Sequence, residues 1–290
     1  MDDTFFTDLA AEARELWKQA CGRELPGLIT DRMETEGIAA DVLEIRDEET
    51  AKELCKPKGR YVTFELGALT RREEDAFPRA CRALAAELRR QLGLSGGESV
   101  LAVCLGNPDV TPDAVGPLAA EHILVTRHLR RAMPETFAPF RSVAVFRSGV
   151  LGTTGVESAA LTAAVAGQVR PDAVVAVDAL AAREASRLCR AVQITDAGIV
   201  PGSGVGNARA AMTAETLGVP VVAVGGPTVV DARTLCAAYT GVAPDTAEEL
   251  FVTPRDIDRR VREIARLVGY AVDLALQEGM TVEDVDLFLS

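Results

Sequence analysis

Five short apolar runs, most of them rich in valine, constrain the fold of this chain more than any other feature. They are SVLAVCLG (99–106), SVAVF (142–146), AVVAVD (173–178), AVQIT (191–195) and PVVAVG (220–225). Strands that are buried on both faces have this nearly continuous apolar character. Helical patterns separate most of the runs, at residues 113–133, 155–169, 181–190 and 207–217. The alternation predicts an α/β fold with a mostly parallel central sheet flanked by helices.

The N-terminal third predicts an α+β elaboration of that sheet. Residues 8–21 and 72–92 carry apolar side chains at helical spacing. Between them, DVLEIR (41–46) and GRYVTFEL (59–66) alternate or carry strand-forming residues. A last helical pattern covers 254–277 and precedes a short acidic tail. Because no internal repeat or low-complexity linker interrupts the chain, we expect a single domain.

Composition excludes several classes of protein. Hydrophobic residues make up 48% and charged residues 26%, which is typical of a soluble globular chain. The chain has no apolar run of about 18 residues, so we expect no membrane span, and the acidic start MDDTFF does not resemble a signal peptide. These features favour a cytoplasmic protein. A net charge of -12 argues against direct nucleic-acid binding, and we interpret RHLRR (127–131) as the solvated face and end of a helix.

The cysteines and histidines give no sign of a metal site. The six cysteines lie far apart, and neither a CxxC pair nor metal-ligand spacing with the two histidines occurs. Such an inventory fits reduced, mostly structural thiols. We therefore expect no metal and no cofactor.

Acidic residues follow two of the predicted strands, where an α/β sheet binds its ligands. Asp109 and Asp113 lie in the loop 106–116, and Asp178 ends the run 173–178. Asp109 suits a side-chain hydrogen bond within the turn. Asp113 either caps the next helix or faces the crevice. Asp178 either caps a helix beginning near residue 181 or also faces the crevice.

Two carboxylates that meet in such a crevice can catalyse hydrolysis. If Asp113 and Asp178 approach each other, like-charge repulsion raises one pKa and leaves an acid beside a base. That arrangement can activate a water molecule without a metal.

Other site types are less well supported by the residues. Ser203, in PGSGVGN (201–207), has no histidine in a plausible relay, because His122 and His128 lie in one helical pattern. PGSGVGN resembles a phosphate cradle but lacks the GK[ST] ending. We expect Gly202, Ser203 and Gly204 to line the crevice instead. We also expect Gly152, Thr153 and Thr154, in the segment GTTG, to form a flexible loop that contacts an extended peptide.

Several long motifs together resemble a known family. They are KPKGRYVTFE, GNPDVTPDAVGP, GTTGVE, PDAVVAVDALAAR, QITDAGIVPGSGVGN and ETLGVPVVAVGGPTVVDA. In this order, from Thr7 to about Val252, they resemble the spore germination protease, the endopeptidase that degrades small acid-soluble spore proteins. The resemblance implies an intracellular homotetrameric peptidase, made as a zymogen and active in the spore core. It also implies a fold related to the hydrogenase maturation endopeptidases, with Asp113 and Asp178 as a catalytic pair.

Two other hypotheses remain open. One is a metal-assisted maturation endopeptidase of the same fold, although neither histidine lies in a strand-end loop where a third ligand would be expected. The other is a non-catalytic nucleotide- or ligand-binding module that uses PGSGVGN. The chain also departs from the family pattern, because only about a dozen residues separate a helix expected at 227–239 from the one at 254–277.

The N-terminal segment TDLAAEA (7–13) has two interpretations. Asp8 as N-cap and Glu12 in the first turns favour the start of a helix. The resemblance implies instead a zymogen cleavage site, which we place between Asp8 and Leu9. Residues 1–8 would then be a propeptide, and 9–290 the peptidase domain.

Overall fold

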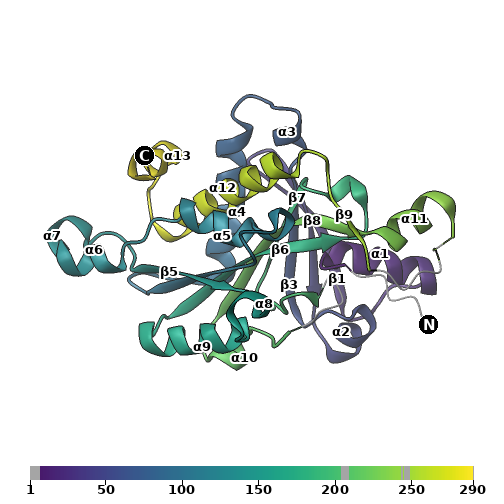
Figure 1. Cartoon of the computed structure of the whole chain (residues 1–290), viewed down its shortest axis with the longest axis horizontal. Helices are drawn as coiled ribbons and strands as arrows, with labels where there is room; N and C mark the ends of the chain where they lie inside the picture. The colour runs from purple at the N-terminus through teal and green to yellow at the C-terminus, as the bar shows by residue number, and fades with distance from the viewer. Residues whose placement is uncertain (1–6, 204–208, 243, 245–248, 290) are drawn as a thin grey trace.

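A large mixed β-sheet organises the chain. The computed structural model describes residues 7–203, 209–242, 244 and 249–289, and its nine-stranded sheet has the order β1-β2-β3-β7-β8-β6-β4-β5, with β9 also paired to β8 (Figure 1). The strands are β1 (Leu28–Thr35), β2 (Ile38–Ile45), β3 (Gly59–Glu65), β4 (Val100–Leu105), β5 (Val143–Gly149), β6 (Ala173–Ala182), β7 (Ala191–Thr195), β8 (Val221–Asp231) and β9 (Phe251–Val252). All five predicted Val-rich runs form strands.

The parallel part of the sheet consists of β8, β6, β4 and β5, and the remaining pairs are antiparallel. The α/β class is confirmed, but the sheet is mixed rather than mostly parallel. The run 191–195 differs from our expectation because β7 is antiparallel to both β3 and β8. An apolar pattern reports burial and not direction, so it could not distinguish these cases.

Helices cover both faces of the sheet, as Figure 1 shows. On one face lie α4 (Ala76–Leu92), α5 (Val115–Ala119) and α12 (Ile257–Leu276), whose apolar sides share a core with Ala102 and Cys104 of β4. On the other face, α9 (Ser158–Val169) contacts β4 and β5. Leu101 and Val103 of β4 belong to the core of that second face. This alternation along one strand is what burial on both faces requires.

The strand β6 extends past its neighbour β4, which positions the functional site. Pairing with β4 ends at Cys104 and Val177, whereas pairing with β8 continues to Ala182 and Val230. Residues 178–182 of β6 therefore have a strand on one edge only, as far as the described residues go. Every second residue of β6 directs its backbone N–H and C=O groups toward β4. Ala173 is one of them, and its N–H donates to the carbonyl of Ser99. Beyond the end of β4, backbone groups on this edge of β6 bond to partners other than a strand: the Ala179 N–H donates to the Asp178 side chain, and the N–H and C=O of Ala181 both bond to Asp8.

Several predicted helices differ from the observed elements. The pattern 113–133 is broken into η1 (Thr111–Asp113), α5, η2 (Ala120–His122) and α6 (Arg127–Ala132). Between η2 and α6, the backbone N–H groups of Leu124 and Thr126 donate to the Asp273 side chain and the Val143 carbonyl, which replaces helical hydrogen bonding.

The C-terminal side of the sheet also departs from the expected helices. The pattern 181–190 continues β6 and then forms only η3 (Ala185–Arg187). The pattern 207–217 gives the short α10 (Ala214–Leu217), and the start of that range lies outside the described residues. Most of 227–239 forms α11 (Ala232–Thr240), because β8 continues to Asp231, and the acidic tail forms α13 (Val282–Leu289).

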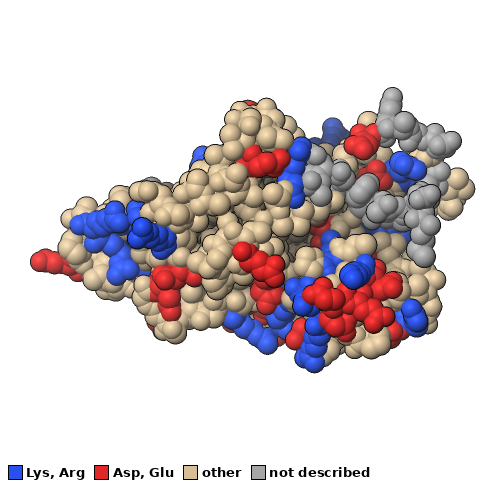
Figure 2. All heavy atoms as spheres, turned by 90° about the horizontal axis from the view of Figure 1, so that it is seen from below, with Lys and Arg blue, Asp and Glu red and all other residues tan. Residues whose placement is uncertain are grey.

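The N-terminal elaboration adds α1 (Ala10–Cys21), α2 (Glu48–Leu54), α3 (Gly67–Thr70) and three antiparallel strands. The first of these strands, β1, was not predicted, and its residues are mostly exposed. The short helices α6 and α7 (Pro134–Phe137) lie at one end of the molecule, where Lys and Arg side chains gather (Figure 2). The predicted basic helix end at 127–131 belongs to this group. Among the described residues, no helix is long and apolar enough to cross a membrane.

Candidate active site

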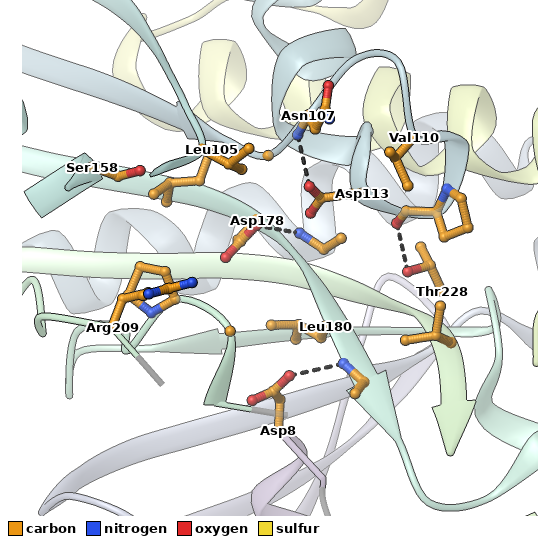
Figure 3. Close-up of a pocket in the computed structure, with 18 of the residues that line it drawn as sticks. Asp8, Leu105, Asn107, Val110, Asp113, Ser158, Asp178, Leu180, Arg209 and Thr228 are labelled. Carbon is orange, nitrogen blue, oxygen red and sulfur yellow. Dashed lines mark hydrogen bonds between the residues drawn. The ribbon is translucent and has the colours of Figure 1, made fainter. Parts of the chain in front are cut away.

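A cavity of about 570 Å³ opens at the carboxyl ends of β4 and β6. Its lining comes from separate parts of the chain: the loop after β4, the start of α8 (Leu151–Thr154), the end of β6, residues 199–202, and β8 with β9. Figure 3 shows Asp113 and Asp178 in its upper part and Asp8 below them. The two aspartates selected from the sequence therefore lie in one cavity.

Asp113 is held by the loop that it follows. It ends η1, and its Oδ2 accepts a hydrogen bond of 2.8 Å from the backbone N–H of Asn107. The side chain thus spans the turn and does not cap α5. The Asx-type bond expected of Asp109 is made by another residue, because Asn107 Oδ1 accepts from the Asp109 N–H at 3.0 Å while Asp109 itself is exposed.

Two glycines let this loop pack against the strands. Gly106 has φ +116, and a Cβ there would lie 2.0 Å from the carbonyl oxygen of Asp113. A Cβ on Gly116 would lie 2.1 Å from the Leu105 carbonyl oxygen and 2.7 Å from that of Val177. Real Cβ atoms essentially never come within 3.0 Å of such neighbours. Because Gly106 and Gly116 have no side chain, the backbone of this loop lies directly against the backbone of β4 and β6. This contact fixes the position of Asp113 relative to β6.

Asp178 lies within β6 and is only 7% exposed. Its Oδ1 accepts a hydrogen bond of 2.9 Å from the N–H of Ala179. The proposed role as a helix cap is wrong, because the strand continues to Ala182 and no helix begins at 181. The side chain instead points into the cavity, toward the same space as Asp113 (Figure 3).

The electrostatics of the pair favour one shared proton. Burial raises the pKa of Asp178 well above its ordinary value, and the neighbouring Asp113 carboxylate raises it further. Burial also raises the pKa of Asp113, while the hydrogen bond from Asn107 lowers it. Two like charges in one buried site disfavour double ionisation. Chemically, the arrangement offers a carboxylic acid beside a carboxylate.

The Gly-rich segments contribute to the cavity in part. Gly152 lines it, but GTTG is not a loop: it lies in and just after α8, and the hydroxyls of Thr153 and Thr154 donate to the carbonyl of Val150. Neither threonine is among the lining residues. Gly202 lines the cavity as predicted, whereas Gly204 lies outside the described residues.

Asp8 enters the cavity from the N-terminal segment. It is not the N-cap of α1, because that position is held by Leu9 and no side chain caps the helix. The Asp8 carboxylate accepts hydrogen bonds from the N–H of Ala181 at 2.8 Å and from the hydroxyl of Ser203 at 2.7 Å. Leu9 is fully buried. The segment 7–9 is thus packed against the site.

Some lining residues were not predicted from the sequence. Arg209 lies on the Asp178 side of the cavity (Figure 3), 3.8 Å from Glu157 between Nη1 and Oε1. Thr228, at an irregularity in β8, donates its hydroxyl to the carbonyl of Pro112 and so supports the loop that carries Asp113. Arg209 lies outside the quoted family motifs, and Thr228 lies in ETLGVPVVAVGGPTVVDA, where no feature of the motif singles it out. The family motifs gave only the strand in which Thr228 lies.

Residues that could hold a metal do not gather in the described part of the chain. No group of three or more His, Cys, Asp or Glu side chains there has the arrangement of a metal site. His122 packs edge-on against Tyr270, with ring centroids 6.0 Å apart, and it lies in η2 while His128 lies in α6.

Comparison with known proteins gives consistent relatives. The sequence model of one family, described as germination protease, matches residues 7–243. A germination protease from Caldanaerobacter subterraneus subsp. tengcongensis is 39% identical, over 98% of this chain and 97% of the relative. One from Clostridium perfringens is 34% identical over 98% of both chains. The alignment with the former spans 318 residues, so the relative carries positions with no counterpart among the 290 residues here.

A solved structure is also similar in part. The [NiFe] hydrogenase maturation protease HycI from Thermococcus kodakarensis covers 64% of this chain and 98% of its own, at 19% identity and a TM-score of 0.37. The sequence relatives extend over nearly the whole chain and include every strand around the cavity. This chain therefore belongs to the germination protease family, and it is a protease that acts in spore germination.

Proposed function

We propose that the chain is an endopeptidase of small acid-soluble spore proteins and that Asp113 and Asp178 activate water for peptide hydrolysis. The observation that carries the proposal is the meeting of these two side chains, one from the loop after β4 and one from β6, in a single cavity. The family supports a protease of germination. The substrate class follows from the resemblance of the motifs.

The pKa directions support a different role for each carboxyl group. Asp178, whose pKa burial and Asp113 raise well above its ordinary value, carries the proton. Burial also raises the pKa of Asp113, but the hydrogen bond from the Asn107 N–H opposes that shift, so in this proposal Asp113 is the ionised partner and accepts a proton from the attacking water. The water oxygen adds to the scissile carbonyl carbon, Asp178 gives its proton to the leaving amine, and the C–N bond breaks. The proton that Asp113 has taken returns to Asp178 through solvent, which restores the pair.

Substitution of each aspartate tests this mechanism. Asp113→Asn and Asp178→Asn each remove a carboxyl group that the reaction needs, so each should lower the cleavage rate of purified spore protein by about 10²-fold or more. Asp109→Asn is the matched control in the same loop and should keep most activity, because its side chain is exposed and is not among the residues that line the cavity. Inactive Asp109→Asn together with active Asp113→Asn would refute the assignment.

Treatment with a chelator distinguishes the aspartate mechanism from a metal-assisted endopeptidase and from a non-catalytic module. Without a catalytic metal, treatment with EDTA leaves the cleavage rate unchanged. Loss of activity on chelation, with recovery on adding a divalent ion, would favour a metal-assisted maturation endopeptidase. No cleavage together with nucleotide binding would favour a non-catalytic module.

We also propose that the chain is a zymogen that cleaves itself between Asp8 and Leu9, and that the active enzyme is a homotetramer of the spore core without a cofactor. The bond is not poised for attack, since the Asp8 carbonyl accepts a hydrogen bond from Gln193 Nε2 at 3.1 Å and Leu9 is buried. The segment must therefore leave its place before cleavage. Intact-mass measurement after mild acidification should show loss of Met1 to Asp8 in the wild type and not in Asp178→Asn. An active chain that retains these residues would contradict the zymogen model.

A further inference from the structure

One positively charged side chain lies among the described residues that line the active-site cavity. Arg209 is the only lysine or arginine among them, whereas four acidic side chains line the same space: Asp8, Asp113, Glu157 and Asp178. Figure 3 shows Arg209 on the same side of the cavity as Asp178. In a partly buried cavity, the attraction between a cation and a negative charge is stronger than in bulk water. Arg209 is therefore a candidate binding group for an anion that forms there.

The backbone of Arg209 is fixed to the core of the domain. The Arg209 N–H donates to the carbonyl of Pro201 at 2.9 Å, and Ile199 and Met212 exchange backbone hydrogen bonds of 2.9 and 2.8 Å. Residues 199–201 and 209–212 are thus paired in the antiparallel sense. Met212 is fully buried and packs in the core on the α9 face of the sheet. Anchoring of this kind holds a functional side chain in place before a substrate arrives.

The guanidinium group of Arg209 has a counter-ion but keeps its hydrogen-bond donors. Its Nη1 lies 3.8 Å from Oε1 of Glu157, which is close enough for an ion pair and too far for a hydrogen bond. Within the described part of the chain, the guanidinium donates no hydrogen bond. A guanidinium carries five N–H donors in a planar fork. These donors are therefore available to a substrate in the cavity.

Glu157 holds the guanidinium beside the aspartate pair. It directly precedes α9, and the hydroxyl of the next residue, Ser158, donates to the Gly149 carbonyl at 3.0 Å, which fixes the start of the helix. A cation in direct contact with Asp178 would lower the pKa of that carboxyl group and remove its proton. Instead, burial and the Asp113 carboxylate raise the pKa of Asp178. The guanidinium thus lies near the pair without binding it, which leaves room for a substrate carbonyl group.

The proposed hydrolysis forms a negative charge that the two aspartates do not neutralise. When water adds to the scissile carbonyl carbon, the π electrons of the C=O bond move to the oxygen, and Asp113 takes a proton from the water. The proton of Asp178 is needed by the leaving amine. Enzymes stabilise such an oxygen with preorganised hydrogen-bond donors. Arg209 is the cationic donor among the described residues of the cavity.

We infer that Arg209 binds the oxygen of the scissile carbonyl group and stabilises its negative charge in the tetrahedral intermediate, and that Glu157 positions the guanidinium for this contact. The inference rests on the proposed function, because it adds an oxyanion donor to the aspartate mechanism. No covalent bond to Arg209 forms or breaks. When the intermediate collapses, the electron pair returns to the C=O bond, and the amine leaves with the proton of Asp178. Arg209 is then a catalytic residue, and Glu157 is a positioning residue.

Replacing the arginine tests the contact by kinetics. Arg209→Gln removes the charge, so kcat for cleavage of purified spore protein should fall about 10²–10³-fold while KM stays within about threefold. The matched control is Arg147→Gln on β5, because Arg147 is also exposed and loosely paired, 3.5 Å from Glu121, and does not line the cavity. Arg147→Gln should keep the wild-type rate, and circular dichroism establishes that both variants are folded. A loss of less than about tenfold in Arg209→Gln, or a loss carried by KM, would overturn the inference.

The pH profile tests the positioning role of Glu157. In Glu157→Gln the guanidinium loses its counter-ion and moves toward the aspartate pair, where it lowers the pKa of the protonated carboxyl group. The alkaline limb of the cleavage rate marks the loss of that proton, so it should move to lower pH. Arg209→Gln, with no guanidinium, should leave the limb in place. An unchanged limb in Glu157→Gln would overturn the positioning role.

A binding measurement tests the oxyanion contact without hydrolysis. The probe is a phosphinic peptide that copies the first bond cleaved in spore protein and replaces its amide by a negatively charged, tetrahedral phosphinate. Calorimetry compares it with the parent peptide in the Asp113→Asn background, with and without Arg209→Gln. Loss of the arginine should weaken the phosphinic peptide by at least about tenfold and the parent peptide by less than about threefold. Equal effects on both peptides, or none on the phosphinic peptide, would overturn the inference.

The variants also distinguish this inference from the proposed function. An active Asp113→Asn together with an impaired Arg209→Gln would refute the aspartate pair and not the oxyanion donor. An active Arg209→Gln together with an inactive Asp113→Asn would overturn the role of Arg209 alone.

Discussion

Replacing Gly116 by alanine should separate Asp113 from Asp178, the proposed catalytic pair. The added Cβ would lie 2.1 Å from the Leu105 carbonyl oxygen and 2.7 Å from that of Val177, both backbone atoms of central strands. An acceptable contact needs more than 3.0 Å, so α5 and the loop before it must move outward by about 1 Å. Asp113 lies three residues before Gly116, whereas Asp178 follows Val177 and stays with β6. The two carboxyl groups should therefore move apart.

The expected effects on stability and activity differ in size. Overpacking of this kind typically costs about 1–3 kcal/mol of unfolding free energy. A misplacement of about 1 Å at a catalytic group costs about 10²-fold in rate. If Gly116→Ala is mostly folded at the assay temperature, unfolding removes only a small part of the active enzyme. A loss of about 10²-fold in rate would then come from the displaced carboxyl group.

The matched control is Gly167→Ala, within α9 on the other face. A Cβ there meets nothing within 4 Å, and alanine stabilises a helix interior by about 0.5–1 kcal/mol relative to glycine. Urea unfolding followed by circular dichroism gives the stabilities, and cleavage of purified spore protein gives the rates. If Gly116→Ala cleaves within threefold of the wild-type rate, or if Gly167→Ala loses as much activity, the reasoning is refuted.

Three further predictions concern titration and reactivity. Burial raises the pKa of Asp273 to about 8, so this group stays protonated in the folded state while its unfolded counterpart ionises above about pH 4. The free energy of unfolding should therefore fall between about pH 4 and 8, by at most about 5 kcal/mol. Urea titrations at several pH values should show a smaller fall for Asp273→Asn. A cleavage rate that depends on one proton shared by Asp113 and Asp178 should show a bell-shaped pH profile, and a profile with no alkaline limb would contradict the assignment of the proton. Thiol reagents should leave the rate unchanged, because burial raises the pKa of Cys104, beside the site, to about 12; labelling of Cys104 in parallel with inactivation, measured by peptide mass, would contradict this.

The strands could be predicted because burial on both faces leaves a strong sequence signal, but their ends and directions could not. The run 173–178 is apolar and Val-rich, whereas its continuation ALAA has as much helical as strand character. Only pairing with β8 makes residues 179–182 a strand. The direction of β7 depends likewise on which strands it meets, and not on its own residues.

That Asp113 and Asp178 meet in one cavity could be predicted from the rule that ligands bind at strand ends, since both aspartates follow apolar runs. The contacts of Asp8 could not. Its partners, Ala181 and Ser203, lie more than 170 residues away in the chain. A local pattern gave helix capping instead, which is the ordinary use of an aspartate before an amphipathic segment. Contacts between distant segments need the assembled sheet before they can be seen.

The unpaired edge of β6 also bears on solubility. An open strand edge is a template for any extended chain, including the same edge of a second molecule, and exposed edges promote aggregation. In the uncleaved chain, Asp8 covers this edge and places a negative charge on it. Under the proposed cleavage after Asp8, release of the segment would expose the edge. The short length of the edge, residues 178–182, and the arginine that follows it limit that risk.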